Sequence, residues 1–142
     1  MASGKEHDNA TCFLSLPFSL CLCLLVGLAN GLIAGLAFAF GGLWLSPDLD
    51  TYSKALKRWG PLKGLWWPYR KLIPHRSLFS HGPLIGTALR LTYLISWTAL
   101  LLMLLQPLGF PTLLSVTKAC KEQLRLNPQP FLSLLIGLEA SA

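Results

Sequence analysis

Long apolar runs alternate with short polar segments along this chain of 142 residues. The first apolar run extends from Cys12 to Ser46 and contains no charged residue over 35 positions. A single helix needs only about 20 apolar residues to cross a bilayer. The run is therefore long enough to fold back on itself as two helices.

We predict a helical hairpin over residues 11–46, because Asn30-Gly31 near the middle of the run is a turn signal. Its arms would be Thr11–Leu28 and Leu32–Trp44. Glycines spaced four apart in this run (Gly27, Gly31 and Gly35) would let the two arms approach closely. One overlong helix, partial burial in a helical bundle and a cleaved signal peptide are the alternatives, the last opposed by the acidic start MASGKEHDNA.

The next segment, residues 51–82, is basic and aromatic. Seven of the twelve Lys and Arg residues lie between Lys54 and Arg76, and such a block beside apolar runs is typical of a cytoplasmic loop. Its three prolines exclude one long helix. Because Trp and Tyr beside basic residues are typical of the headgroup level, we expect residues 54–76 to contact anionic lipid headgroups. We expect no nucleic-acid partner, although aromatic stacking on single strands is the competing interpretation.

A further apolar run, residues 83–108, predicts another membrane helix with one charge, Arg90, which would snorkel toward the interface. Pro107, Gly109 and Pro111 end it, and residues 112–142 predict amphipathic or partial C-terminal helices. Apolar residues make up 53% of the chain and charged residues 13%, against about 25% charge in soluble domains. The prediction is one all-α, membrane-embedded, multi-pass domain, residues 1–142, with three to four helices.

The three histidines and four of the six acidic residues gather in three places: Glu6-His7-Asp8, Asp48 with Asp50, and His75 with His81. A hairpin over residues 11–46 would put all three on one side of the membrane, predicted to be cytoplasmic together with the N-terminus. Imidazole and carboxylate ligands suit Zn, Mn or Fe better than Ca or Mg. Two such ions held close together can clamp a phosphate ester and activate a water.

Each of these polar places also has a simpler interpretation. Asp8 would cap the first helix, and Asp48 and Asp50 would form a turn or pair with nearby cations, although acids at a helix C-terminus oppose its dipole. His75 and His81 are six residues apart, about 240° on a helix. They would converge only if the chain turns before Pro83. On spacing alone, a metal site and plain interfacial histidines are equally supported.

The residues in these same places resemble an uncharacterised bacterial family of metal-binding proteins. The match covers nearly the whole chain in order. Its motifs are SGKEHD (Ser3 to Asp8), GGLWLSPDLD (Gly41 to Asp50), SKALKRWG (Ser53 to Gly60) and WPYRKLIPHRSLFSHGPLIGT (Trp67 to Thr87), and the last of these is the most specific. The chain is also similar to inner-membrane metal-dependent hydrolases that carry PDxD followed by HR and a second His. That group is distantly similar to the all-helical zinc-dependent phospholipase C fold.

The resemblance implies a divalent transition metal, Zn, Mn or Fe, held by a set of six residues. These are His7, Asp8, Asp48, Asp50, His75 and His81. In the family, the final stretch continues into a helix with another His and Asp, whereas this sequence ends at Ala142. We therefore expect those late ligands to be missing, as in a truncated member of the family.

Three functions follow from these residues. The first is a metal-dependent hydrolase of phosphate esters, with Arg76 holding the phosphate through its planar guanidinium. The second is a metal-binding membrane protein without catalysis. The third is a structural or lipid-interacting membrane protein without metal, which would use its basic aromatic loop. The residues leave open whether the protein is an enzyme.

Overall fold

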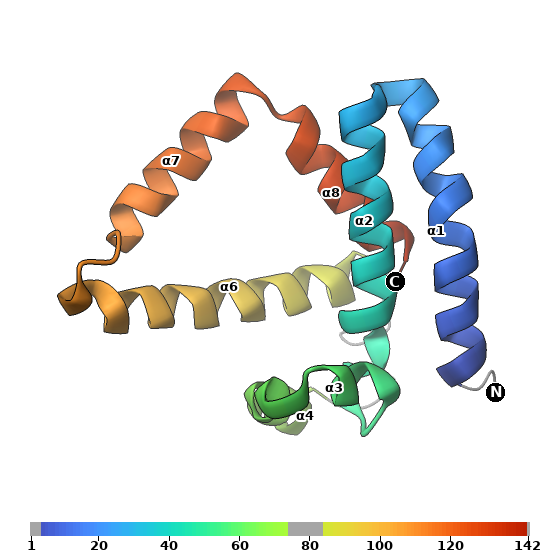
Figure 1. Cartoon of the computed structure of the whole chain (residues 1–142). Coiled ribbons are helices and arrows are strands. Elements are labelled where there is room, and N and C mark those ends of the chain that lie inside the picture. Colours follow the sequence, from blue (N-terminus) through green and yellow to red (C-terminus); the bar gives the residue numbers. More distant parts are fainter. Residues whose placement is uncertain (1–3, 74–83, 142) are drawn as a thin grey trace.

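The computed structural model describes residues 4–73 and 84–141, and in these residues the fold is all-helical (Figure 1). His75, Arg76 and His81 lie outside the described residues. The α-helices are α1 (Gly4–Val26), α2 (Leu28–Trp44), α3 (Lys54–Arg58), α4 (Trp67–Leu72), α6 (Ile85–Leu105), α7 (Leu113–Leu126) and α8 (Gln129–Ala140). Three 3₁₀ helices connect them: η1 (Pro47–Asp50), η2 (Gly60–Trp66) and η3 (Gln106–Leu108).

The predicted N-terminal hairpin is confirmed: α1 and α2 lie side by side as antiparallel helices (Figure 1). The predicted end of its second arm at Trp44 is confirmed, but the predicted start and turn were wrong. The turn is at Gly27, whose φ of 88° favours glycine, and α1 begins at Gly4 instead of Thr11. Asn30 lies inside the first turn of α2, where its side chain donates to the carbonyl of Val26 at 3.0 Å.

Small residues let α1, α2 and α8 approach closely. A Cβ added to Gly31 would lie 2.3 Å from the backbone nitrogen of Cys23 in α1, and one added to Gly35 would lie 2.3 Å from the Cβ of Ser19. On the α8 side, a Cβ on Gly137 would lie 2.1 Å from the carbonyl oxygen of Ala34. Helix α2 is therefore held between α1 and α8 by backbone approach at glycines.

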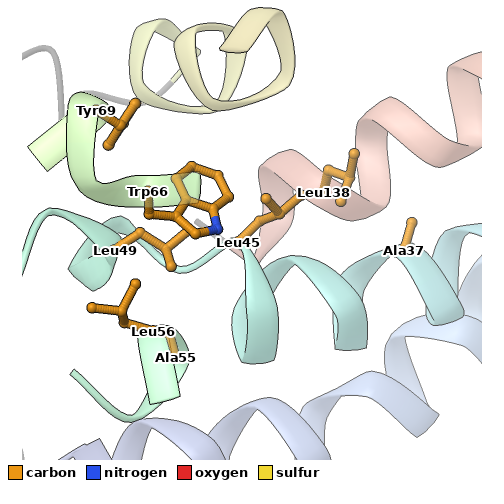
Figure 2. Packing of buried hydrophobic residues seen from close by; sticks show 8 residues of the cluster. All are labelled: Ala37, Leu45, Leu49, Ala55, Leu56, Trp66, Tyr69 and Leu138. Carbon is orange, nitrogen blue, oxygen red and sulfur yellow. The ribbon is translucent and has the colours of Figure 1, made fainter. Parts of the chain in front are cut away.

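The hydrophobic core lies at the C-terminal end of α2, where the short helices of the basic segment fold over it (Figure 2). Trp66 is fully buried, and its ring centroid lies 5.4 Å from those of both Tyr69 and Tyr93. The predicted contact with lipid headgroups is left to the exposed aromatic residues of this segment, since Trp66 and Tyr69 are buried inside the protein. Their rings pack inward because prolines break the segment into short helices that fold back over Leu49 and Leu56.

Within residues 4–73 and 84–141, three helical segments are long and apolar enough to cross a membrane: Lys5–Val26, Leu28–Asp50 and Ile85–Leu108. In Figure 1, α6 runs away from the α1–α2 hairpin, and α7 and α8 return the chain to α2. Large apolar side chains on α1 and α6 are exposed, among them Phe13, Leu24 and Leu104. Such wide apolar exposure is rare in soluble monomers.

Candidate metal centre

A pocket of about 210 Å³ lies at the open end of the hairpin, where the start of α1 meets the segment after α2. It is lined by His7, Asp8, Gly42, Ser46, Asp48, Ser53, Lys54 and Ala55. His7 and Asp48, separated by the whole hairpin in sequence, are thus brought to one cavity. This is the convergence that the hairpin topology predicted for these two residues.

Helix α1 supplies His7 and Asp8 from its second turn. The interpretation of Asp8 as a helix cap is therefore wrong, because α1 begins four residues earlier. Instead, both carboxylate oxygens of Asp8 accept hydrogen bonds from Arg58, at 3.1 Å from Nη1 and 2.5 Å from Nη2. Lys54 Nζ lies 3.8 Å from Asp8 Oδ2. Asp8 is thus held by two cations of α3.

Arg58 also closes the C-terminal end of α2. Its Nη1 donates to the carbonyl of Leu43 at 2.8 Å, and the indole nitrogen of Trp59 donates to the carbonyl of Trp44 at 3.0 Å. The last carbonyls of a helix have no partner inside the helix, and a cation there suits the helix dipole. Sequence reasoning missed this role, because it assigned the cations of α3 to the nearby Asp48 and Asp50 or to lipid.

Asp48 and Asp50 belong to η1, a short helix capped by Ser46, whose Oγ accepts from the backbone N–H of Asp48 at 3.4 Å. The two acids therefore lie in the first turn of a new helix, where negative charge suits the dipole. This removes the apparent conflict with the C-terminus of α2. Residues two apart on a 3₁₀ helix are separated by about 240°, so the two acids have different surroundings: Asp48 lines the pocket, while Asp50 is buried.

Asp50 belongs to a second polar cluster, next to the core. It lies close enough to Tyr69 and Arg90 to interact electrostatically with both. Burial is the main cause that raises the pKa of Tyr69, so its hydroxyl stays protonated at neutral pH. Arg90 is 2% exposed and its Nη2 donates to Thr87 Oγ1 at 3.2 Å. The prediction that Arg90 snorkels toward water was wrong, because these polar partners hold it inside.

The donors around the pocket, an imidazole and two carboxylates, are of the kind that Zn, Mn and Fe take. In residues 4–73 and 84–141, however, no group of three or more His, Cys, Asp or Glu side chains is close enough together to hold a metal ion. The two further predicted ligands, His75 and His81, and the predicted phosphate ligand Arg76 fall outside these ranges. The described residues of the pocket thus offer donor atoms of a type that suits a transition metal, without forming a cluster of three.

Comparison with known proteins gives one family and one partial relative. The sequence model of a family described as "Uncharacterized metal-binding protein (DUF2227)" matches residues 2–142. An uncharacterised protein of Aquifex aeolicus (strain VF5) is 43% identical over 61 residues, which make up 42% of this chain and 43% of that protein. The chain thus matches less than half of the length of this relative. No solved structure matches the chain.

Proposed function

Because the chain belongs to the family of uncharacterised metal-binding proteins, we propose that it is a membrane protein that binds a divalent transition metal at the open end of the α1–α2 hairpin. The observation that carries the proposal is the shared pocket of His7 and Asp48. An imidazole and a carboxylate from two distant segments, facing one cavity, are the start of a mixed nitrogen and oxygen ligand set.

Within this proposal, the residues of the pocket have different tasks. His7 and Asp48 are the ligands that line the pocket. The family resemblance implies Asp50, His75 and His81 as further ligands, but Asp50 is buried in the second polar cluster beside Tyr69 and Arg90, so the proposal does not rest on it. Asp8 is bonded through both oxygens to Arg58. We therefore assign Asp8 the task of fixing the start of α1, and with it His7, against α3. When bound, the metal would supply a Lewis acid beside Lys54 and Ser53.

The test is metal content of the full-length protein purified in detergent, measured by elemental analysis. The wild type should carry Zn, Mn or Fe in stoichiometric amount. His7→Ala and Asp48→Ala should each lose most of the bound metal, because loss of even an orienting partner of a ligand lowers metal affinity by about 10- to 100-fold. Asp50→Ala, His75→Ala and His81→Ala test the implied ligands. Glu122→Gln, an exposed acid on α7, is the control and should leave the metal content unchanged.

Two results would contradict this assignment. Absence of stoichiometric metal from the wild type, after purification without chelator, would end the metal proposal altogether. Metal retained in both His7→Ala and Asp48→Ala would instead move the site away from the pocket. Asp8→Asn should lower both the melting temperature and the metal affinity, whereas His7→Ala should lower the metal affinity with little change in the melting temperature of the metal-free protein. This difference separates the task assigned to Asp8 from that of a ligand.

A second candidate function is hydrolysis of a phosphate ester at the same place. It is favoured by Lys54, a cation that lines the pocket beside His7 and Asp48, because a phosphate needs a positive partner. Release of a chromogenic phosphodiester's leaving group should then fall on addition of a chelator and in Lys54→Ala. Activity that survives both chelation and Asp48→Ala would be inconsistent with hydrolysis at this site and would leave metal binding without catalysis.

A further inference from the structure

A second cavity, of about 280 Å³, lies on the basic segment and is separate in its lining from the pocket of His7 and Asp48. It is formed by Tyr52, Trp67, Arg70 and Lys71. The described side chains that line it carry two positive charges and no negative charge. A concave site with this charge selects an anion.

Both cations of this cavity are held by aromatic rings. The guanidinium carbon of Arg70 lies 4.0 Å from the ring centroid of Tyr52, and Lys71 Nζ lies 5.3 Å from that of Trp67. Both distances are within the range of cation–π attraction. Arg70 is fixed further, because its Nε donates to the backbone carbonyl of Asp50 at 3.4 Å. Ordering the cations before binding lowers the entropic cost of binding an anion.

Among the described aromatic residues of the basic segment, these two are the exposed ones: Tyr52 is 78% exposed and Trp67 is 60% exposed. This distinguishes Trp67 from its buried neighbour Trp66. Exposed Tyr and Trp beside basic residues are typical of the headgroup level of a membrane. Leu72, the next residue after Lys71, is 78% exposed as well, so an apolar surface adjoins the cations.

From these contacts we infer that the cavity of Tyr52, Trp67, Arg70 and Lys71 binds the phosphate group of an anionic lipid. Arg70 and Lys71 donate to the phosphate oxygens, and the two rings and Leu72 contact the glycerol and the first part of the acyl chains. This inference goes beyond metal binding and does not depend on it, because none of the four lining residues belongs to the candidate metal centre.

Lipid binding to the full-length protein in detergent tests the inference, with affinities measured by native mass spectrometry. The probes are short-chain phosphatidylglycerol, short-chain phosphatidylcholine and glycerol 3-phosphate. Phosphatidylglycerol should bind most tightly. The double variant Arg70→Gln/Lys71→Gln should weaken it by about tenfold, as expected for the loss of charge-assisted hydrogen bonds.

The matched control is Lys57→Gln/Lys63→Gln, which removes the same charge from exposed positions of the same segment. It should weaken binding by less than about twofold, because neither lysine lines the cavity and exposed charges that do not contact the ligand are screened by salt. Arg70→Gln also removes the bond to Asp50, so melting temperatures are compared for all variants. If Arg70→Gln/Lys71→Gln unfolds, Lys71→Gln alone still tests the inference. Its affinity for phosphatidylglycerol should fall by about threefold.

Three outcomes would overturn the inference. Equal losses in the two double variants would mean a diffuse electrostatic attraction without a site. Glycerol 3-phosphate binding as tightly as phosphatidylglycerol would identify a soluble phosphate ester as the ligand. Phosphatidylglycerol affinity unchanged in Arg70→Gln/Lys71→Gln would place lipid binding elsewhere on the chain.

Discussion

Arg58 ties together three parts of the chain that are far apart in sequence. Its guanidinium bonds to both oxygens of Asp8 in α1 and to the carbonyl of Leu43 in α2, while it belongs to α3. The pair is partly shielded, with 28% of the Arg58 side chain and 18% of the Asp8 side chain exposed. A bidentate pair of this kind contributes more than an ordinary surface ion pair.

We expect Arg58→Ala to destabilise the protein by about 1–3 kcal/mol, since it leaves Asp8 and the carbonyl of Leu43 without this donor. The loss of stability in Arg58→Lys should be intermediate, because the ammonium keeps the positive charge but cannot form the two parallel hydrogen bonds of the guanidinium. Thermal unfolding in detergent measures both effects. Lys57→Ala removes an exposed cation from the same helix and is the control. A similar loss in Lys57→Ala and Arg58→Ala would show that only the net charge of α3 matters.

Trp66 and Trp67 are neighbours in sequence with opposite surroundings, one fully buried and the other 60% exposed. Trp66→Ala should cost about 3–5 kcal/mol, as truncation of a buried aromatic residue does. Trp67→Ala should change stability by no more than about 0.5 kcal/mol. Unfolding midpoints of the two variants in the same detergent provide the comparison. Equal effects, or a larger effect at Trp67, would contradict the placement of the core.

At the scale of elements, close packing of the helices depends on glycines at the contact positions. The backbones of α1 and α2 approach so closely at Gly31 and Gly35 that a Cβ there would overlap Cys23 and Ser19. Ser19 uses this proximity, since its hydroxyl donates to the carbonyl of Gly31 at 3.0 Å. Hydroxyl-to-carbonyl bonds of this kind stabilise helix pairs in an apolar medium, where water does not compete.

Gly31→Ala should therefore loosen the hairpin, at a cost of about 1–3 kcal/mol for overpacking. The clash is with the backbone of Cys23, so no side-chain rotation relieves it. Gly64→Ala is the matched control, because a Cβ there meets open space. The melting temperature in detergent should fall for Gly31→Ala alone. A fall of equal size for Gly64→Ala would mean that glycine flexibility, and not close packing, is what matters.

The elements show which features the sequence could predict. The apolar run without charges predicted two helices, and the spacing of Gly31 and Gly35 predicted their close contact. The turn was misplaced because Asn30-Gly31 is a local signal, whereas the small residues of α1 and α2 fix the actual register. Trp66 and Trp67 could not be told apart, because burial of one ring depends on Tyr93, which lies 27 residues further along the chain.

The candidate site, like the fold, could be predicted from the sequence only in part. Once a hairpin is assumed, topology brings His7 and Asp48 to one end, and they do line one pocket. The separation of Asp48 from Asp50 could not be predicted, since PDLD gives no sign that its second acid is buried near Arg90. The pairing of Asp8 with Arg58 spans 50 residues and depends on tertiary packing alone.

At the scale of the whole molecule, the C-terminal helix packs back against the N-terminal hairpin. Helix α8 packs along α2, with Gln129 Oε1 accepting from Asn30 Nδ2 at 3.1 Å near the hairpin turn and Leu138 in the core near the other end. The hairpin thus has two chemically different ends. The turn at Gly27 lies in a stretch without charged residues, and the opposite end carries the pocket, the α3 cations and the anion-binding cavity.

If α1 and α2 both cross the bilayer, the two ends of the hairpin must lie on opposite faces of it. Single cysteines test this in a variant whose four native cysteines are replaced by serine. Cysteines at Lys5 and Gly64 should react with a membrane-impermeant maleimide only from the cytoplasmic face, because basic loops stay on that side. A cysteine at Ala29, next to the turn, should react only from the other face.

Inverted and right-side-out vesicles give the two faces, and labelling after solubilisation controls for buried thiols. Reaction of positions 5 and 64 from opposite faces would separate His7 from the basic segment. The shared pocket of His7 and Asp48 would then not form in the membrane. Reaction of all three positions from one face would mean that the hairpin enters the bilayer without crossing it. The pocket would survive that result, because it needs only the two ends of the α1–α2 pair to stay together.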